Sequence, residues 1–129
     1  MTSTWRNREA AAANRDVDVT FRFRIENDTT QGVGFYVRQN GGYLTQTVPA
    51  GQGYAIFIEG SFRSLPGVGV WKESNGNEIQ IAHSSGVAGP VVGVVYRARF
   101  QTQQLNPTTT ELRARFWPEG GAEPAAWQI

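Results

Sequence analysis

Hydrophobic and polar residues alternate strictly in one stretch of the chain, DVDVTFRFRIEND. From Val17 to Ile25, apolar residues occupy every second position, and Asp, Thr and Arg fill the positions between them. A period of two places alternate side chains on opposite faces of a β-strand. The stretch therefore predicts a strand with one face in a core and the other, charged face in water.

Further short strands are expected along the rest of the chain, separated by turn residues. Alternating or apolar runs predict strands at 32–38, 54–60, 67–73, 77–83, 91–103 and 111–117. Asn40-Gly41 and Asn75-Gly76 favour tight hairpin turns, because Asn and Gly tolerate the positive φ angles that such turns need. This spacing of strands and turns predicts an all-β fold, an antiparallel β-sandwich.

The first residues follow a different pattern. The segment 7–14 contains a run of alanines, which favours a short helix. We expect an N-terminal arm over residues 1–15 and one β-sandwich domain over residues 16–129. A length of 129 residues suits a single domain, and an apolar fraction of 40% supports a packed core.

Charge and composition exclude several classes of function. The net charge of +1 gives no bulk attraction to nucleic acid. No stretch approaches the ~20 apolar residues of a membrane-spanning helix. Without cysteine, the chain has no disulfide and no thiolate metal site. We therefore expect neither nucleic-acid binding nor membrane insertion.

The acidic residues and the single histidine give no catalytic constellation. Asp16 and Asp18 are spaced like paired carboxylates on a strand, but the alternation places both on the solvent side of a strand entrance. His83 lacks the neighbouring partners that a metal or nucleophilic site needs. We predict that the protein is not an enzyme.

Aromatic residues gather around the middle strands, close to Arg38. In GVGVWKE, the valines and Trp71 have opposite parity, so Trp71 faces outward if the valines face the core. Outward aromatic rings suit the faces of sugars, while Trp, Tyr and Arg also dominate subunit interfaces. Arg38, Tyr43, Tyr54 and Trp71 are therefore candidates for glycan binding or for subunit contact.

Four arginines near the end of the chain are expected to share one face. Arg97 and Arg99 alternate on one predicted strand, and Arg113 and Arg115 alternate on the next. If the two strands pair, these side chains form a cationic ladder on the face turned away from the core. Nucleic-acid binding requires aromatic residues on the same face and a larger positive excess, so a solvated or subunit-contacting face is favoured.

The chain ends in ELRARFWPEGGAEPAAWQI, which includes Trp117 and Trp127. A free tail is normally polar, whereas this one is aromatic. Either the ending docks on its own domain through these tryptophans, or a neighbouring chain completes the domain. A missing edge strand leaves unpaired backbone donors and acceptors, which a partner chain can cover.

The last strands and the ending, VVYRARFQTQ … TELRARFWPEGGAEPAAWQ, resemble laminin-G-like, concanavalin-A-like domains of bacterial surface proteins and of phage tail and other virion proteins. The resemblance spans about residues 16–128. It implies a jelly-roll form of the sandwich. Such domains usually continue past the Glu-Pro-X-X-Trp segment, so the resemblance also implies that the last strands are lacking, which slightly favours completion by a neighbour.

The same resemblance raises the question of calcium, because laminin-G-like domains often hold this ion on a loop rim. Asp28, with Asn27 beside it, is the carboxylate best placed for this role. The chemistry of Asx turns explains Asp28 equally well without a metal. We expect no required cofactor, and calcium is the one metal to test.

Two functions from different classes follow. The first is a virion structural or accessory protein, such as a tail, fibre or capsid-decorating sandwich, which in a close variant recognises host surface glycan. An extracellular type of fold without cysteine or signal peptide suits a protein made in the host cytoplasm and assembled as a homo-oligomer or with other virion proteins. The alternative is an extracellular carbohydrate-binding module of a secreted bacterial enzyme or adhesin, with polysaccharide as its partner.

Overall fold

The computed structural model describes residues 15–40, 47–84 and 86–129, and the helix predicted over 7–14 lies outside them. The only helical segment among the described residues is a 3-10 turn, Phe62–Ser64. The described residues form seven strands, which confirms the all-β prediction: β1 (Val17–Phe23), β2 (Gly32–Val37), β3 (Gly53–Glu59), β4 (Gly67–Ser74), β5 (Asn77–His83), β6 (Tyr96–Asn106) and β7 (Thr109–Pro118).

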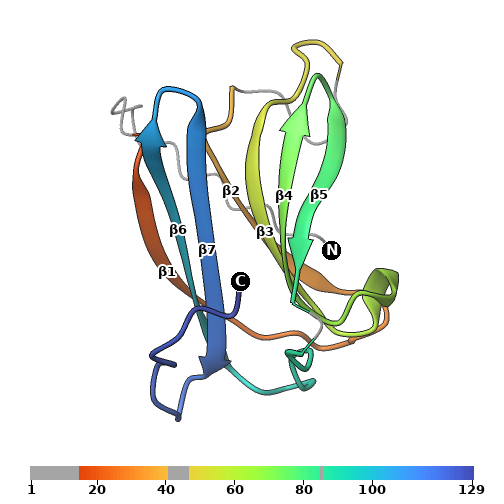
Figure 1. Cartoon of the computed structure of the whole chain (residues 1–129). Coiled ribbons are helices and arrows are strands. Elements are labelled where there is room, and N and C mark those ends of the chain that lie inside the picture. Colours follow the sequence, from red (N-terminus) through yellow and green to blue (C-terminus); the bar gives the residue numbers. More distant parts are fainter. Residues whose placement is uncertain (1–14, 41–46, 85) are drawn as a thin grey trace.

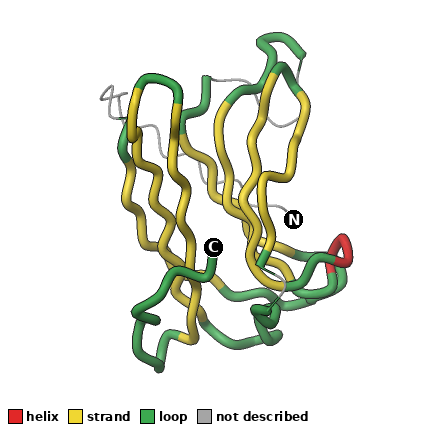
Figure 2. Tube along the Cα trace, in the orientation of Figure 1, coloured by secondary structure: helices red, strands yellow, loops and turns green. Residues whose placement is uncertain are grey.

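The strands form two antiparallel sheets that face each other as a sandwich (Figures 1 and 2). The smaller sheet has the order β1-β6-β7, and the larger sheet has the order β2-β3-β4-β5. The first two strands belong to different sheets. Phe21 on β1 and Phe35 on β2 stack across the interior with their ring centroids 5.1 Å apart.

The core lies between the sheets and is built from alternate positions of the strands. Phe100, Ile56 and Val68 are 0% exposed, because a period of two turns these side chains toward the opposite sheet. The remaining buried positions of the core continue the same inward rows: Val37, Ile58, Val70, Tyr96, Ala98, Ala114 and Phe116.

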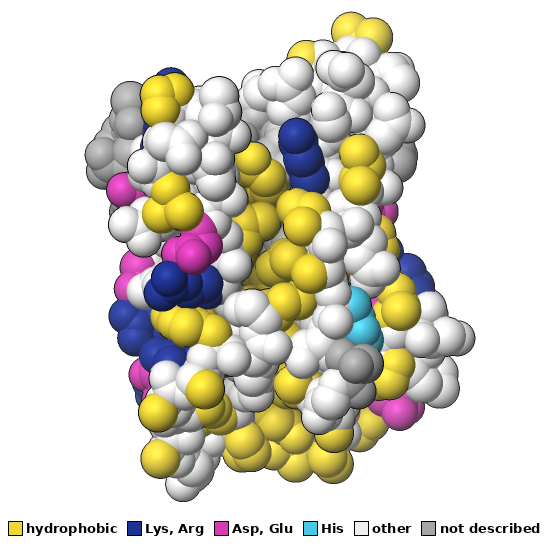
Figure 3. Space-filling model, viewed as in Figure 1, with side chains coloured by type: hydrophobic (Ala, Val, Ile, Leu, Met, Phe, Trp, Pro, Cys, Tyr) yellow, Lys and Arg dark blue, Asp and Glu magenta, His cyan; other side chains and the backbone are white. Residues whose placement is uncertain are grey.

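One side of the sandwich is open. Since β7 contacts β4, the edge strand β5 extends past the smaller sheet. The side chains of Ile79 and Ile81 on this strand are 49% and 50% exposed. Figure 3 shows hydrophobic side chains in the space between the two sheets on this side. A three-stranded sheet therefore leaves part of the four-stranded sheet uncovered.

The turn predictions have mixed outcomes. Asn75 and Gly76 have φ angles of 52° and 74° and join β4 to β5, which confirms the tight hairpin. The tight hairpin predicted at Asn40-Gly41 involves Gly41, which lies outside the described residues. The strands on either side, β2 and β3, pair with Val37 opposite Tyr54, so a two-residue turn does not join them.

The strand predicted over 91–103 begins later than expected. Its first regular residue is Tyr96. Gly93 has a φ angle of 78°, and the N–H of Val94 donates to the carbonyl of Val91, so the apolar residues before Tyr96 form a turn. A continuous apolar run does not distinguish a buried strand from an apolar loop, which explains the error.

Candidate functional site

The outer surface of the larger sheet carries a row of aromatic rings, which we call the aromatic face and define as Tyr36, Phe57 and Trp71. Tyr36 pairs with Ala55, which pairs with Trp71 on the next strand. Trp71 therefore points away from the core and lies opposite to the buried Val70. Three adjacent strands each contribute one ring to this surface.

The rings of the aromatic face form a connected cluster. Phe57 lies between the other two, with its centroid 5.6 Å from that of Tyr36 and 6.0 Å from that of Trp71, both in edge-to-face geometry. Gly34 makes room for Phe57, because a Cβ atom there would lie 2.7 Å from the ring. The ring thus lies directly against the neighbouring strand β2.

Arg63 covers part of the aromatic face. Its guanidinium carbon is 4.8 Å from the ring centroid of Phe57 and 5.0 Å from that of Trp71, which is cation–π geometry. Arg63 and Ser64 both have positive φ angles, 59° and 58°. Such angles are unfavourable for residues with a Cβ atom and are often kept at functional sites. This loop conformation turns the side chain of Arg63 back over the sheet.

A buried carboxylate holds Arg63 in this position. Glu59 is 3% exposed, and its Oε1 accepts hydrogen bonds from Nε and Nη2 of Arg63 at 3.1 and 2.5 Å. Glu78 Oε1 lies 3.6 Å from Nη1 of the same guanidinium. Burial opposes the charge of Arg63, but the hydrogen bonds and the charge of Glu59 raise the pKa of its guanidinium. Sequence patterns did not single out Arg63; the only signal was its spacing of four residues from Glu59.

A pair of carboxylates lies beside this cluster, at the β4–β5 hairpin. Glu73 and Glu78 are direct cross-strand neighbours. Burial and the charge of Glu78 raise the pKa of Glu73, against a hydrogen bond of 3.1 Å that its Oε2 accepts from Gln39. Among the described residues, Oε1 of Glu73 is buried without a hydrogen-bond partner. Two adjacent carboxyl groups therefore lie at the border of the aromatic face, one of them near Arg63.

Two other candidates from the sequence, Arg38 and Tyr54, meet at one end of the sandwich. The guanidinium carbon of Arg38 is 6.0 Å from the ring centroid of Tyr54, and both residues line an open cavity of about 540 Å³. The third candidate, Tyr43, lies outside the described residues. Trp71 lies on the outer surface of the larger sheet and does not line this cavity. The structure thus divides the candidates between two places.

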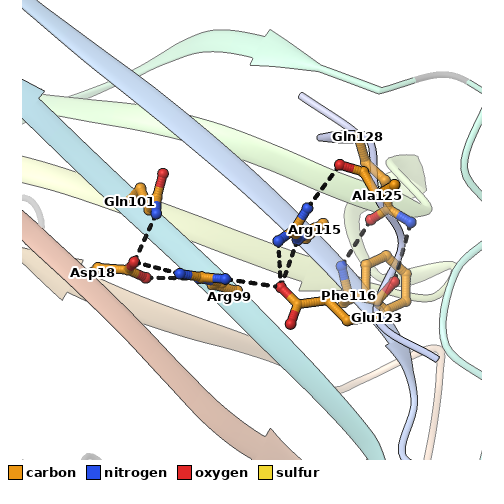
Figure 4. A network of polar contacts seen from close by, with 8 residues as sticks. All are labelled: Asp18, Arg99, Gln101, Arg115, Phe116, Glu123, Ala125 and Gln128. Carbon is orange, nitrogen blue, oxygen red and sulfur yellow. Dashed lines mark hydrogen bonds and ion pairs between the residues drawn. The ribbon is translucent and has the colours of Figure 1, made fainter. Parts of the chain in front are cut away.

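The C-terminal segment lies across the outer surface of the smaller sheet. Trp127 contacts Arg115, whose guanidinium carbon is 4.1 Å from the ring centroid of Trp127. Glu123 accepts hydrogen bonds from Nε of Arg115 at 2.8 Å and from Nη1 of Arg99 at 3.2 Å (Figure 4). Trp117 on β7 is 6% exposed. Of the two alternatives for the aromatic ending, the described contacts are those of docking on its own domain.

The last two residues of the chain form hydrogen bonds with the edge of β7. The side chain of Gln128 accepts from the N–H of Phe116 at 2.8 Å and donates to its carbonyl at 3.0 Å. The N–H of Gln128 donates to the carbonyl of Ala114, and the N–H of Ala114 donates to a terminal oxygen of Ile129. Ile129 packs against the core. The segment therefore satisfies backbone groups that an edge strand otherwise exposes.

The arginine ladder of the smaller sheet is neutralised by carboxylates. Arg99 pairs directly with Arg115 across β6 and β7, as the strand parity predicted. Hydrogen bonds from Arg99 lower the pKa of Asp18, and those from Arg22 lower the pKa of Glu119. Arg99 and Arg115 are both paired with carboxylates of the chain itself, so this surface is not an open cationic face.

The loop that we considered for calcium is organised by its own hydrogen bonds. Oδ1 of Asn27 accepts from the N–H groups of Thr29 and Thr30 at 2.9 and 3.2 Å, which is an Asx turn. The backbone carbonyl of Asp28 accepts from the N–H of Phe62. Within residues 15–40, 47–84 and 86–129, no group of three or more His, Asp or Glu side chains could hold a metal ion.

A comparison with protein-family models, curated proteins and solved structures finds no significant match for this chain. In the part of the chain that the structure describes, no helix has the length and apolar character to cross a membrane.

Proposed function

We propose that this chain is a β-sandwich that recognises polysaccharide through the aromatic face of its larger sheet. The observation that carries the proposal is the cluster of Tyr36, Phe57 and Trp71 on three adjacent strands. Aromatic rings bind the apolar faces of sugars, and polar groups at the border fix the orientation of the ligand.

The way in which Arg63 is held supports a binding role. Its guanidinium is fixed by Glu59 and by two rings, so a ligand that contacts it meets a side chain that is already ordered. Ordering a long side chain during binding costs about 0.5–1.5 kcal/mol, which this arrangement avoids. Gln80 on β5 is exposed beside Trp71, its cross-strand partner, and offers an amide for the hydroxyl groups of a sugar.

The resemblance of the last strands to laminin-G-like domains supports the same proposal and suggests its setting. We assign the chain to the jelly-roll type of sandwich and place it either on a virion, where it binds the surface glycan of a host, or in an extracellular carbohydrate-binding module. Both settings use a binding surface and require no catalytic group or cofactor.

A second candidate function, as a structural subunit of a virion assembly, is favoured by a different observation. Val91 and Val92 in the loop before β6 are 61% and 45% exposed, and Ile79 and Ile81 are half exposed on the open side. Exposed apolar side chains of this kind favour a contact with another subunit. Light scattering separates the two candidates: a closed oligomer supports the assembly, and a monomer supports the binding module.

The test of the proposal is a glycan array followed by titration of the best ligand. We expect Trp71→Ala to lower the affinity at least tenfold, about 1.4 kcal/mol, because a stacking surface is lost. Trp127→Phe is the matched control, since Trp127 also contacts an arginine but lies on the other sheet. A folded Trp71→Ala variant with unchanged affinity contradicts the proposed site.

A further inference from the structure

An open cavity of about 540 Å³ lies between the segment before β3 and the turn that joins β6 to β7. Figure 1 shows that these two segments lie at the same end of the sandwich. This volume is within the range of sites for small molecules. Its walls combine guanidinium, hydroxyl and amide groups with one aromatic ring and one proline, and they consist of Arg15, Arg38, Tyr54, Gln104, Pro107, Thr108 and Thr110.

The charged groups of the walls have one sign. Arg15 and Arg38 line the cavity, and none of the described lining residues is a carboxylate. Asp16 lies nearby, with Oδ1 3.7 Å from Nη2 of Arg38, but its side chain is 64% exposed and accepts a hydrogen bond from the N–H of Gln104. The cavity therefore presents positive charge to a molecule that enters it.

Arg15 differs from the other arginines of the described residues. Each of the others forms an ion pair with a carboxylate. The side chain of Arg15 is exposed and forms neither an ion pair nor a hydrogen bond within residues 15–40, 47–84 and 86–129. In a chain that neutralises its arginines so consistently, an unpaired guanidinium at the rim of a cavity has its donors available for a ligand.

Arg38 forms a fixed part of the wall. Its Nη1 donates to Oε1 of Gln104 at 2.7 Å and to Oγ1 of Thr110 at 3.0 Å, and its Nε donates to the carbonyl of Arg15 at 2.5 Å. Its Nη2 makes no hydrogen bond among the described residues. The backbone φ angle of Arg38 is 54°, a strained value for a residue with a Cβ atom. The hydrogen bonds hold the guanidinium in place before any ligand arrives.

We infer that this cavity binds the carboxylate of an acidic sugar, such as a uronic acid, with Arg15 as the principal anion-binding group. Guanidinium groups bind carboxylates through charge-assisted and often bidentate hydrogen bonds. The ring of Tyr54 suits the apolar face of a sugar ring. The hydroxyl groups of Thr108 and Thr110 already donate to Asn106 and Gln104, and each oxygen can still accept a hydrogen bond from a sugar hydroxyl. The inference does not depend on the aromatic face, because the two places share no lining residue.

The test is an NMR titration of the isotopically labelled chain with glucuronate, glucose and acetate. Glucuronate differs from glucose only at C6, where a carboxylate replaces the hydroxymethyl group, and acetate supplies a carboxylate without a sugar. We expect glucuronate to shift the amide signals of Thr108 and Thr110 and to bind at least about fivefold more tightly than either of the other two compounds. Arg15→Gln removes this preference, whereas Arg24→Gln, at an arginine paired with Glu26, leaves it unchanged.

The titration can overturn the inference in several ways. Equal binding of glucose shows that the carboxylate is not recognised, and equal binding of acetate shows that the sugar is not recognised. Unchanged binding of glucuronate by a folded Arg15→Gln variant also contradicts the inference. Signal shifts confined to the surroundings of Trp71 contradict the cavity as the binding site and leave the proposed function intact. Conversely, a Trp71→Ala variant with unchanged glycan affinity contradicts the aromatic face as a site and leaves the cavity unaffected.

Discussion

The outer surfaces of the two sheets each bring an arginine and a tryptophan together, but in opposite arrangements. On the smaller sheet, Arg115 belongs to β7 and Trp127 comes from the C-terminal segment that lies on it. On the larger sheet, Trp71 belongs to β4 and Arg63 comes from the loop that folds over it. On the smaller sheet the pair therefore fixes the C-terminal segment over the surface, whereas on the larger sheet the tryptophan is part of the sheet and contributes to the aromatic face.

The carboxylate partners explain this difference. Glu123, the partner of Arg115, lies in the C-terminal segment, so the ion pair attaches that segment to the sheet. Glu59, the partner of Arg63, lies on β3 within the sheet itself, so this ion pair attaches only the short loop that carries Arg63. A surface whose arginine is neutralised from within the sheet stays accessible to a ligand.

Burial also separates the two carboxylates. The side chain of Glu59 is 3% exposed, whereas that of Glu123 is 36% exposed. Removing the partner of a buried charge leaves it without compensation, while an exposed charge is hydrated again. The ion pair on the larger sheet is therefore the one whose loss has the greater consequence.

The largest effect is expected for Arg63→Met, which keeps the apolar stem over Phe57 but leaves Glu59 without its partner. We expect a loss of about 3 kcal/mol in the free energy of unfolding near neutral pH, because an uncompensated carboxylate stays buried. Denaturant unfolding monitored by tryptophan fluorescence measures this loss.

The matched variant on the other surface is Arg115→Met. Its partner Glu123 can be hydrated in place, so the loss is expected to be smaller than that of Arg63→Met. The double variant Glu59→Gln/Arg63→Met is expected to recover much of the stability, since it removes the buried charge together with its partner. Equal losses for Arg63→Met and Arg115→Met contradict the distinction between the two surfaces.

The sequence predicted much of the fold because strands follow from local patterns. Alternation located β1, and the parity of Arg99 and Arg115 placed them on one face. Asn75-Gly76 predicted a turn because both residues accept positive φ angles. In each case the information lies within a few neighbouring residues of the chain.

The arrangement of the candidate sites could not be predicted, because it depends on contacts between distant residues. Arg38 donates to Gln104 and to Thr110, which are 66 and 72 positions away in the sequence. Arg63 reaches Trp71 because two consecutive non-glycine residues, Arg63 and Ser64, adopt positive φ angles. The amino-acid composition does not predict such a conformation. Long-range pairing and strained backbone thus carry the information that local patterns lack.

An intermediate effect is expected for Gln128→Ala, which tests the covered surface. The substitution removes the hydrogen bonds to the N–H and the carbonyl of Phe116 at the edge of β7. We expect a loss of about 1.5 kcal/mol in stability and roughly tenfold faster hydrogen exchange of the Phe116 amide. Gln103→Ala, at an exposed position of β6, is the control. An unchanged exchange rate of the Phe116 amide would mean that Gln128 does not protect this edge of β7.

The smallest effect concerns the charges that border the aromatic face, where the two surfaces again differ. On the smaller sheet, hydrogen bonds from arginines lower the pKa of Asp18 and of Glu119. On the larger sheet, burial and the charge of Glu78 raise the pKa of Glu73. A carboxyl group with a raised pKa in the folded state favours folding fully below its pKa in the unfolded chain. That contribution is lost as the pH rises through the folded value.

Glu73→Gln therefore distinguishes the two surfaces by its dependence on pH. The variant keeps an oxygen that accepts the hydrogen bond from Gln39 but removes the buried charge. We expect it to stabilise the protein by about 1 kcal/mol near pH 7 and to have little effect near pH 3, well below the ordinary pKa of a glutamate, where Glu73 is mostly protonated in both states. Thermal unfolding across this pH range measures the difference, with the exposed Glu26→Gln as control. A stabilisation that is independent of pH would show that the gain comes from packing and not from the charge that Glu73 carries beside Glu78.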